Sequence, residues 1–229
     1  MGQPGSGGDE KGEHPGFEDR LGGEMELGEV RRILDRWAPV YNPTHAWTLP
    51  KRQAARLALG LRPGDRVLDL ACGTGLNIPH LRSLVGEGGR VVGVDVSPGM
   101  LEVAEALIAG RGWKNVEVRE ADAAQLPFPD ESFDRGICSF AMTIIPDYER
   151  AIREMWRVLV PGGRFVSLEG RSGIHALPRV WRVCGADMRR DTLAGLREVF
   201  GEVTVKRYWL GAISLAAATK QAAIRPGIP

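Results

Sequence analysis

The feature that most constrains this chain is an apolar run that ends in two glycines, residues 67–75, VLDLACGTG. The branched and apolar residues predict a short buried strand, and Gly73 and Gly75 let the backbone turn sharply and lie against a ligand. A helical pattern follows at once, with apolar residues on one face at Ile78, Leu81 and Val85. Strand, glycine turn and helix in this order place the free N–H groups of a helix N-terminus beside the turn, which is typical of a nucleotide site.

An acid inside that run narrows the class of ligand. The dinucleotide fingerprint needs a third glycine three residues after Gly75, where this chain has Ile78. Asp69 stands just before the turn, where it would repel a pyrophosphate but suits a ligand with an amino group or a sulfonium. A second apolar run ends in Asp95, about 20 residues past Gly75, where the carboxylate of a βαβ unit can accept both ribose hydroxyls. S-adenosylmethionine, which joins a sulfonium and an amino group to adenosine, meets both conditions.

Three motifs together carry a resemblance to a known family. They are D-x-x-x-G-x-G at 69–75, G-V-D-x-S at 93–97 and A-D-A at 121–123. This pattern resembles the Rossmann-like (class I) S-adenosylmethionine-dependent methyltransferases. The chain is similar to their quinone-biosynthesis type and to its small-molecule and phospholipid relatives, from about Leu34 to Lys220. The resemblance implies that the cofactor is S-adenosylmethionine.

The resemblance also implies which residues contact the cofactor. In the family the A-D-A turn reads the adenine: Asp122 would accept from the exocyclic amine, and a backbone N–H beside Ala123 would donate to the ring. Tyr41 lies in a segment like the one that closes over the cofactor, although this chain has Asn42 where the family usually has an aspartate. The full set of cofactor-binding residues implied is Tyr41, Asp69, Ala71, Gly73, Thr74, Gly75, Asp95, Val96, Met100, Asp122, Ala123 and Ser139.

The periodicity predicts an α/β fold, a Rossmann-like seven-stranded, mostly parallel sheet with helices on both faces. Two helices come first, within residues 24–60. We expect Pro39 and Pro43 to stop the first helix, and Leu57 to face inward on the second. The strands are predicted near 67–71, 91–95, 116–120, 133–140 and 165–168, and a closing antiparallel hairpin at 203–209 and 212–217.

At 229 residues the chain suits one domain with a sizeable core. Residues 1–23 are Gly-rich and acidic with few branched apolar side chains, so we expect a disordered tail. The methyltransferase domain would then be 24–229, with lid helices at 24–60. Residues 169–190 follow a strand end without clear periodicity, where a substrate pocket would be built.

Composition excludes several classes of partner. The net charge is +1 and there is no dense run of Lys or Arg, so nothing indicates nucleic-acid binding. No apolar run approaches the length of a membrane span, although the first helix with Trp37 could touch a bilayer surface. Cys72, Cys138 and Cys184 have neither disulfide nor metal-ligand spacing, which fits a cytoplasmic protein without a metal site. The sequence leaves the oligomeric state open.

The predicted reaction is a one-step, in-line displacement of the methyl group by a nucleophile on a small-molecule or lipid acceptor, such as a phospholipid amine or a quinone-like compound. A phenol or carbon acid would also need a base, for which His45 and His175 are the candidates. Two alternatives remain open at this point. One is an NAD(P)-dependent oxidoreductase, which Asp69 and Ile78 disfavour, and the other is a protein that binds the cofactor without turnover.

Overall fold

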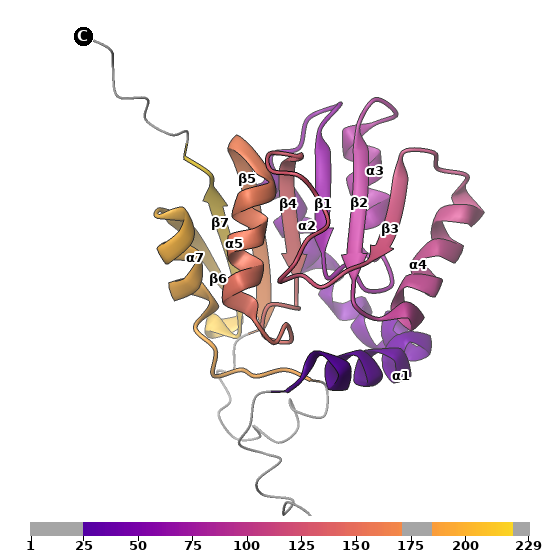
Figure 1. Cartoon of the computed structure of the whole chain (residues 1–229), viewed down its shortest axis with the longest axis horizontal. Coiled ribbons are helices and arrows are strands. Elements are labelled where there is room, and N and C mark those ends of the chain that lie inside the picture. The colour runs from indigo at the N-terminus through magenta and orange to yellow at the C-terminus, as the bar shows by residue number, and fades with distance from the viewer. Residues whose placement is uncertain (1–24, 171–184, 222–229) are drawn as a thin grey trace, which may run out of the picture.

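A single twisted sheet runs through the molecule, in the order β3-β2-β1-β4-β5-β7-β6 (Figure 1). The computed structural model describes residues 25–170 and 185–221. Within these residues β7 is the one strand antiparallel to its neighbours, β5 and β6. The strands are β1 (Arg66–Leu70), β2 (Arg90–Asp95), β3 (Val116–Glu120), β4 (Phe133–Ser139), β5 (Leu159–Gly170), β6 (Val203–Tyr208) and β7 (Ile213–Thr219). The predicted seven-stranded sheet with its C-terminal antiparallel hairpin is confirmed.

Helices cover both faces of the sheet, as the sequence predicts (Figure 1). Apolar side chains of α5 and α7 pack on one face in one core cluster, and those of α2 and α3 pack on the other face in a second. The inner strands are buried on both faces, which explains their continuous apolar runs. The helices are α1 (Leu27–His45), α2 (Leu49–Leu59), α3 (Ile78–Val85), α4 (Pro98–Arg111), α5 (Tyr148–Val158) and α7 (Thr192–Phe200), with short 3₁₀ turns η2 (Ala46–Thr48) and η3 (Trp209–Gly211).

The prediction that two prolines stop the first helix is wrong, because α1 continues through both Pro39 and Pro43. A proline inside a helix costs about 3 kcal/mol through a lost hydrogen bond and a steric clash. Contacts with distant residues on both sides of Pro39 offset this cost. The Asp35 carboxylate accepts from Ser97 Oγ at 2.6 Å and from Gly99 N at 3.0 Å, and Asn42 accepts from Thr74 Oγ1 at 2.5 Å. These bonds hold α1 across the carboxyl ends of the strands.

The second helix begins and ends close to the predicted residues, but its inward face is different. Leu57, expected inside, is 70% exposed. Two arginines, Arg52 and Arg56, are buried instead, with 3% and 4% of their surface exposed. Arginine is rarely fully buried unless it is paired, so helical periodicity alone gave no reason to place them there. Their position beneath the carboxyl end of the sheet makes them part of the candidate site.

Candidate active site

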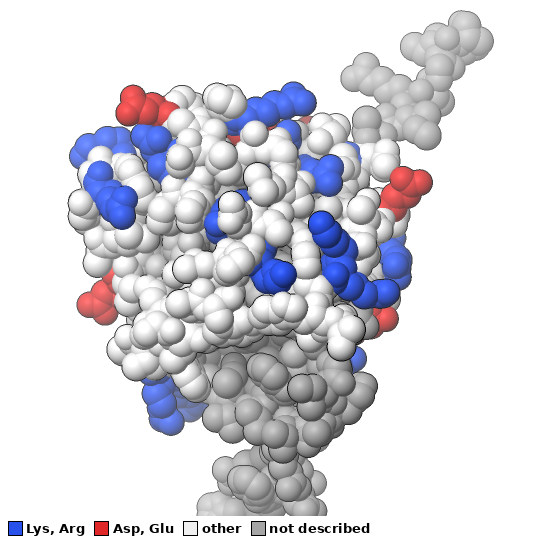
Figure 2. All heavy atoms as spheres, turned by 180° about the vertical axis from the view of Figure 1, so that it is seen from behind, with Lys and Arg blue, Asp and Glu red and all other residues white. Residues whose placement is uncertain are grey.

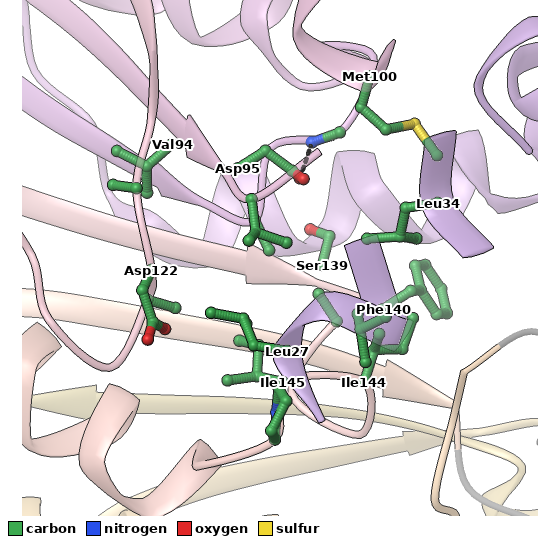
Figure 3. Close-up of a pocket in the computed structure, with 18 of the residues that line it drawn as sticks. Leu27, Leu34, Val94, Asp95, Met100, Asp122, Ser139, Phe140, Ile144 and Ile145 are labelled. Carbon is green, nitrogen blue, oxygen red and sulfur yellow. Dashed lines mark hydrogen bonds between the residues drawn. The ribbon is translucent and has the colours of Figure 1, made fainter. Parts of the chain in front are cut away.

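A pocket with an empty volume of about 650 Å³ lies at the carboxyl ends of the central strands, roofed by α1 (Figure 3). Open α/β sheets bind their ligands at this end. Most of the cofactor-binding residues implied by the resemblance line it. They are Tyr41, Ala71, Gly73, Asp95, Val96, Met100, Asp122, Ala123 and Ser139. Asp69, Thr74 and Gly75 are close by in sequence but do not line this pocket.

The floor of the pocket is the turn that follows β1. Its backbone takes positive φ angles at Ala71 (52°), Gly73 (56°) and Gly75 (80°). A Cβ on Gly75 would stand 3.0 Å from Ile78 Cδ1 and 3.3 Å from the Cβ of Ala104. Both conformation and space therefore require glycine at residue 75, and the tight turn keeps the start of α3 close to β1.

Asp95, at the tip of β2, is fixed by the same turn. One of its carboxylate oxygens accepts from Gly73 N at 2.8 Å (Figure 3), and the other accepts from Ser97 N at 3.0 Å. Burial raises the pKa of Asp95, and these N–H groups oppose that shift. Each oxygen has a further lone pair, and the residue lines the pocket. The carboxylate can therefore accept two neighbouring hydroxyl groups, such as those of a ribose.

The adjoining end of the pocket is a largely apolar slot. The side chains of Leu27, Val30 and Leu34 on α1 form one wall, and Met100 lies near them (Figure 3). Asp122 is at the rim, where one carboxylate oxygen accepts from Ala124 N at 2.9 Å and the other is free of hydrogen bonds to described residues. A flat apolar slot with a carboxylate acceptor at its rim suits a purine with an exocyclic amine.

Asp69, treated in the sequence as an isolated acid, lies behind the turn among other charges. It is fully buried, and Oδ1 accepts from Asn77 Nδ2 at 3.1 Å, whereas Oδ2 has no partner among the described residues. Burial raises its pKa to about 7, against the opposing effects of the Asn77 hydrogen bond and of the charges of Arg52 and Arg56. The assumption that Asp69 is an isolated negative charge is therefore wrong, because Asp69 belongs to a buried cluster that also contains the two cations Arg52 and Arg56.

Arg52 connects this cluster to the pocket. Its Nε donates to Thr48 Oγ1 at 3.0 Å, and Nη1 donates to Asn77 Oδ1 at 3.4 Å. The guanidinium carbon lies 5.4 Å from the ring centre of Phe140, which lines the pocket. Burial raises the pKa of Tyr41, which also lines the pocket, and Arg52 opposes this shift as its nearest cation. A cationic side chain is thus held directly behind the pocket wall.

Of the two histidines considered as a possible base, the structure describes only His45. His45 stacks on Tyr41 with ring centres 3.9 Å apart, and its Nδ1 lies 3.0 Å from the backbone oxygen of Tyr41. It does not line the pocket, and burial lowers its pKa. His175 lies outside the described residues, as do the predicted tail, residues 1–23, and residues 171–184 of the predicted substrate-pocket segment.

The sequence did not predict every residue that lines the pocket. The loop after β4 contributes an apolar wall, for which only the general rule about strand ends gave a signal. Phe140 has φ 60° and donates its backbone N–H to Leu168 O at 2.6 Å, which turns its ring toward the site. The further lining residues are Leu27, Val30, Leu34, Val94, Phe140, Ala141, Ile144, Ile145 and Pro146.

Comparison with known proteins agrees with this geometry. Residues 67–163 match the family described as "Methyltransferase domain". The chain is 43% identical over 162 residues to a demethylmenaquinone methyltransferase of Symbiobacterium thermophilum, which covers 68% of this chain and 64% of that protein. It is 39% identical over 142 residues to a ubiquinone/menaquinone biosynthesis C-methyltransferase of Cronobacter sakazakii, over 56% of this chain and 57% of that protein. The chain therefore matches less than two thirds of the length of either relative.

A solved structure shares the fold. The SAM-dependent methyltransferase of Aquifex aeolicus superposes with a TM-score of 0.62 at 20% identity, over 86% of this chain and 99% of that chain. Fold, pocket and matched domain agree: the chain contains a methyltransferase domain at residues 67–163 within a Rossmann-like fold, and it is similar to S-adenosylmethionine-dependent methyltransferases. The two curated relatives are named as quinone-biosynthesis methyltransferases.

Proposed function

We propose that this chain transfers the methyl group of S-adenosylmethionine to a small-molecule acceptor of the quinone type. The main support for the proposal is that Asp95 and Asp122, which lie at or just after the ends of successive strands, line the same pocket. There they would accept hydrogen bonds from the ribose and from the adenine of the cofactor. The printed names of the relatives favour a quinone-like acceptor over a phospholipid amine. An oxidoreductase is not supported, because the antiparallel β7 between β5 and β6 differs from the dinucleotide-binding strand order.

The chain's own residues fit the cofactor at each end. Asp95 would accept from the ribose, and Asp122 from the adenine amine. The amino-acid end of the cofactor carries both an ammonium and a carboxylate, and it would lie over the turn near Ser139. Behind that wall Asp69 has an unpartnered oxygen, and Arg52 supplies a cation, so both charges of the amino acid have a complement.

When bound, S-adenosylmethionine supplies a methyl group already activated by the sulfonium. The protein's part is then to align the acceptor and to keep water out. Ile144 and Ile145 give the pocket an apolar wall opposite the cofactor residues. Tyr41 lines the pocket and is protonated at neutral pH, since its ordinary pKa is near 10 and burial raises that pKa further, so its hydroxyl would be available to donate a hydrogen bond to the methyl acceptor.

An acceptor of this type is lipid-soluble, so the protein would meet it at a membrane surface while residing in the cytoplasm. Within residues 25–170 and 185–221, no helix is both long enough and apolar enough to cross a bilayer. Contact would then be peripheral. Trp37 on α1, the contact expected from the sequence, is half-buried and offers only part of its ring.

Calorimetric titration of the whole protein with S-adenosylmethionine and with NADH tests the cofactor. A methyl-transfer assay with isotopically labelled donor, read by mass spectrometry over quinone-like and amine acceptors, tests the reaction. Arg52→Gln should weaken cofactor binding about tenfold, because a hydrogen bond to a charged group is lost. Arg36→Gln, at an exposed position on the same side of the molecule, is the matched control. Binding of NADH alone, or cofactor binding without any methylated product, would contradict the proposal.

A further inference from the structure

An exposed aromatic and basic surface lies beside the active site. Trp47 of η2 and Trp209 of η3 are 52% and 56% exposed, and their rings stack with centres 5.6 Å apart. Leu210, next to Trp209, is completely exposed. Lys51 Nζ lies 5.4 Å from the ring centre of Trp209, Lys206 Nζ lies 5.6 Å from that of Tyr208, and exposed Arg207 precedes Trp209 by two residues on β6. We call the six residues the tryptophan surface: Trp47, Lys51, Lys206, Arg207, Trp209 and Leu210.

The backbone of the β6–β7 hairpin holds this surface in an unfavourable conformation. Trp209 and Leu210 both have left-handed φ angles, 50° and 53°, although neither is glycine. Such angles are costly for residues with a Cβ and persist where the surrounding structure imposes them, often at functional sites. Here the conformation turns Trp209 onto Trp47 and leaves the Leu210 side chain in solvent. The hairpin therefore presents an exposed apolar side chain, which contact with another molecule or with a membrane would remove from water.

Charge around the tryptophan surface has a single sign. Residues 36–64 contain five Lys or Arg and no Asp or Glu, and residues 203–221 contain three and none; of these eight cations, Arg52, Arg56 and Lys220 are buried and the other five are at least partly exposed. The two stretches pack together: α2 contacts β7, and Lys51 Nζ lies 4.2 Å from the ring centre of Tyr208. Figure 2 views the face behind the sheet, where α2 lies, and shows Lys and Arg across its middle with Asp and Glu only near its edges. The chain's overall net charge of +1 conceals this local excess.

We propose that the tryptophan surface binds the headgroup region of a bilayer that contains anionic phospholipid. Tryptophan, with an apolar ring and one N–H donor, favours the boundary between acyl chains and water. Leu210 would enter the acyl region, and the surrounding cations would pair with anionic headgroups. A second copy of this chain is a poorer partner, because a twofold contact would bring identical basic surfaces together.

The tryptophan surface adjoins the pocket through one aromatic contact. The ring of Trp47 lies 6.2 Å from that of Phe140, and Phe140 lines the pocket. A lipid-soluble acceptor leaving the bilayer here would therefore enter the active site without crossing bulk water. This consequence for substrate entry rests on the proposed function, whereas membrane binding itself does not.

Co-sedimentation of the full chain with vesicles tests the proposal. Vesicles made of equal parts phosphatidylcholine and phosphatidylglycerol should carry the protein down, and vesicles of phosphatidylcholine alone should carry much less. Added salt should release part of the bound protein, because it screens the headgroup charge. Tryptophan emission should shift to shorter wavelength only with the anionic vesicles.

Two variants separate the apolar and the charged contributions. Leu210→Asn keeps a residue that tolerates a left-handed φ and should lower the partition coefficient about threefold or more. The double variant Lys206→Glu with Arg207→Glu should lower it more than about tenfold. Leu84→Asn, which changes an exposed leucine on α3, is the matched control and should bind as the unaltered protein does.

The outcomes distinguish membrane binding from the proposed reaction. Cofactor titration and methyl transfer to a water-soluble acceptor, measured on the same samples, should be unchanged in all three variants. Loss of vesicle binding with intact methyl transfer supports the tryptophan surface as the membrane contact. Equal binding by every variant, or no binding to anionic vesicles, overturns it. A dimer in solution that Leu210→Asn dissociates would assign the surface to a second copy instead. Vesicle binding without any methyl transfer would reject the proposed function alone.

Discussion

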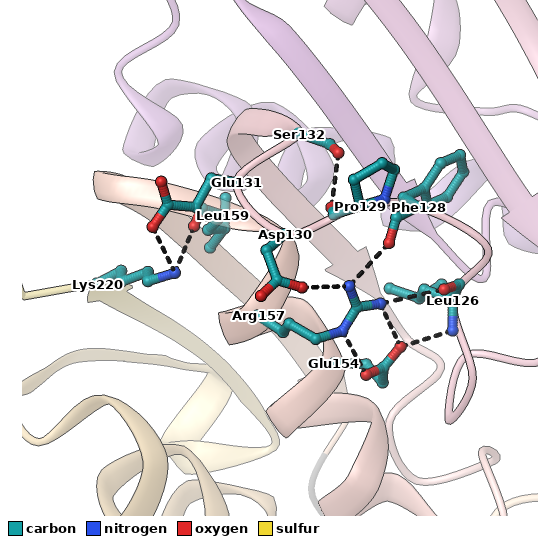
Figure 4. Close-up of polar contacts among 10 residues, drawn as sticks. All are labelled: Leu126, Phe128, Pro129, Asp130, Glu131, Ser132, Glu154, Arg157, Leu159 and Lys220. Atoms are coloured by element: carbon teal, nitrogen blue, oxygen red, sulfur yellow. Dashed lines mark hydrogen bonds and ion pairs between the residues drawn. The ribbon is translucent and has the colours of Figure 1, made fainter.

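Two regions of this chain surround arginine side chains in different ways: Arg157 is partly exposed, and Arg56 is buried. In the part of the chain that the structure describes, Arg157 on α5 has a hydrogen-bond partner for each guanidinium nitrogen (Figure 4). On α2, the Nη1 atom of Arg56 is buried with no partner among the described residues. The acceptors around Arg157 are Glu154, Asp130 and the backbone oxygens of Leu126 and Phe128.

The pKa values of the two arginines shift in opposite directions. Hydrogen bonding to Glu154 raises the pKa of Arg157, while burial lowers the pKa of Arg56 to about 10, helped by the like charge of Arg52. The satisfied network around Arg157 fixes residues 126–130 of the loop between β3 and β4, none of which lines the pocket. The α2 cluster retains unused hydrogen-bonding capacity beside the pocket. A complete network favours stability, and an incomplete one next to a cavity indicates a binding site.

The largest expected effect is on cofactor binding at the pocket. Asp95→Ala removes two hydrogen bonds to a charged acceptor, each worth about 1.5–3 kcal/mol, so the dissociation constant for S-adenosylmethionine should rise at least tenfold. Calorimetry measures it. An unchanged constant would place the ribose elsewhere.

The next effect tests the satisfied region. Arg157→Met leaves Glu154 and two backbone oxygens without their donor, so the free energy of unfolding should fall by about 2–3 kcal/mol. Chemical denaturation measures this change. Affinity for S-adenosylmethionine should stay within a factor of about two, because neither Arg157 nor any of its hydrogen-bond acceptors lines the pocket. A large loss of affinity would remove the distinction between the two regions.

A pH-dependent effect comes from Glu169, at the tip of β5. Its Oε1 accepts from Met142 N at 3.2 Å, Oε2 has no partner among the described residues, and burial raises its pKa to about 7. A raised carboxyl pKa means that the folded state holds the proton more tightly. Stability from this group is therefore full below its unfolded pKa and is lost as the pH rises through about 7.

Glu169→Gln should remove this dependence. Between pH 5 and pH 8 the unaltered protein should lose about 1–3 kcal/mol of unfolding free energy more than the variant does. Denaturation at several pH values gives the difference directly, and subtraction cancels other groups that titrate in both proteins. Parallel curves would show that Glu169 ionises normally.

The smallest effect is expected from the matched substitution on α2. Arg56→Met replaces an incompletely bonded buried cation by an apolar side chain of similar length, so the unfolding free energy should change by less than about 1 kcal/mol. The same change at residue 157 costs more, which makes the pair a direct comparison of the two regions. A loss as large as that of Arg157→Met would mean that Arg56 is satisfied in solution.

Short-range sequence patterns predicted much of the fold and of the site. They failed where contacts between residues distant in the sequence decide the structure. Strand ends, the glycine turn, Asp95 and Asp122 follow from short-range periodicity and spacing. The continuation of α1 through Pro39 could not be predicted, because distant contacts offset a local penalty. The burial of Arg52 could not be predicted for a related reason: one of its acceptors, Asn77, is 25 residues away in the chain, and helical periodicity treats a charged side chain as exposed.

The position of β7 has a consequence for how the molecule is made. Among the described residues, this strand is the last in sequence order, yet it lies inside the sheet, between β5 and β6. During synthesis, the backbone edge of β5 stays unpaired until residues 213–219 leave the ribosome. An open apolar edge is a template for aggregation. Incomplete chains that lack residues 213–219 would therefore be prone to self-association. We expect cellular quality control to act most strongly on chains whose translation stops late, before these residues are made.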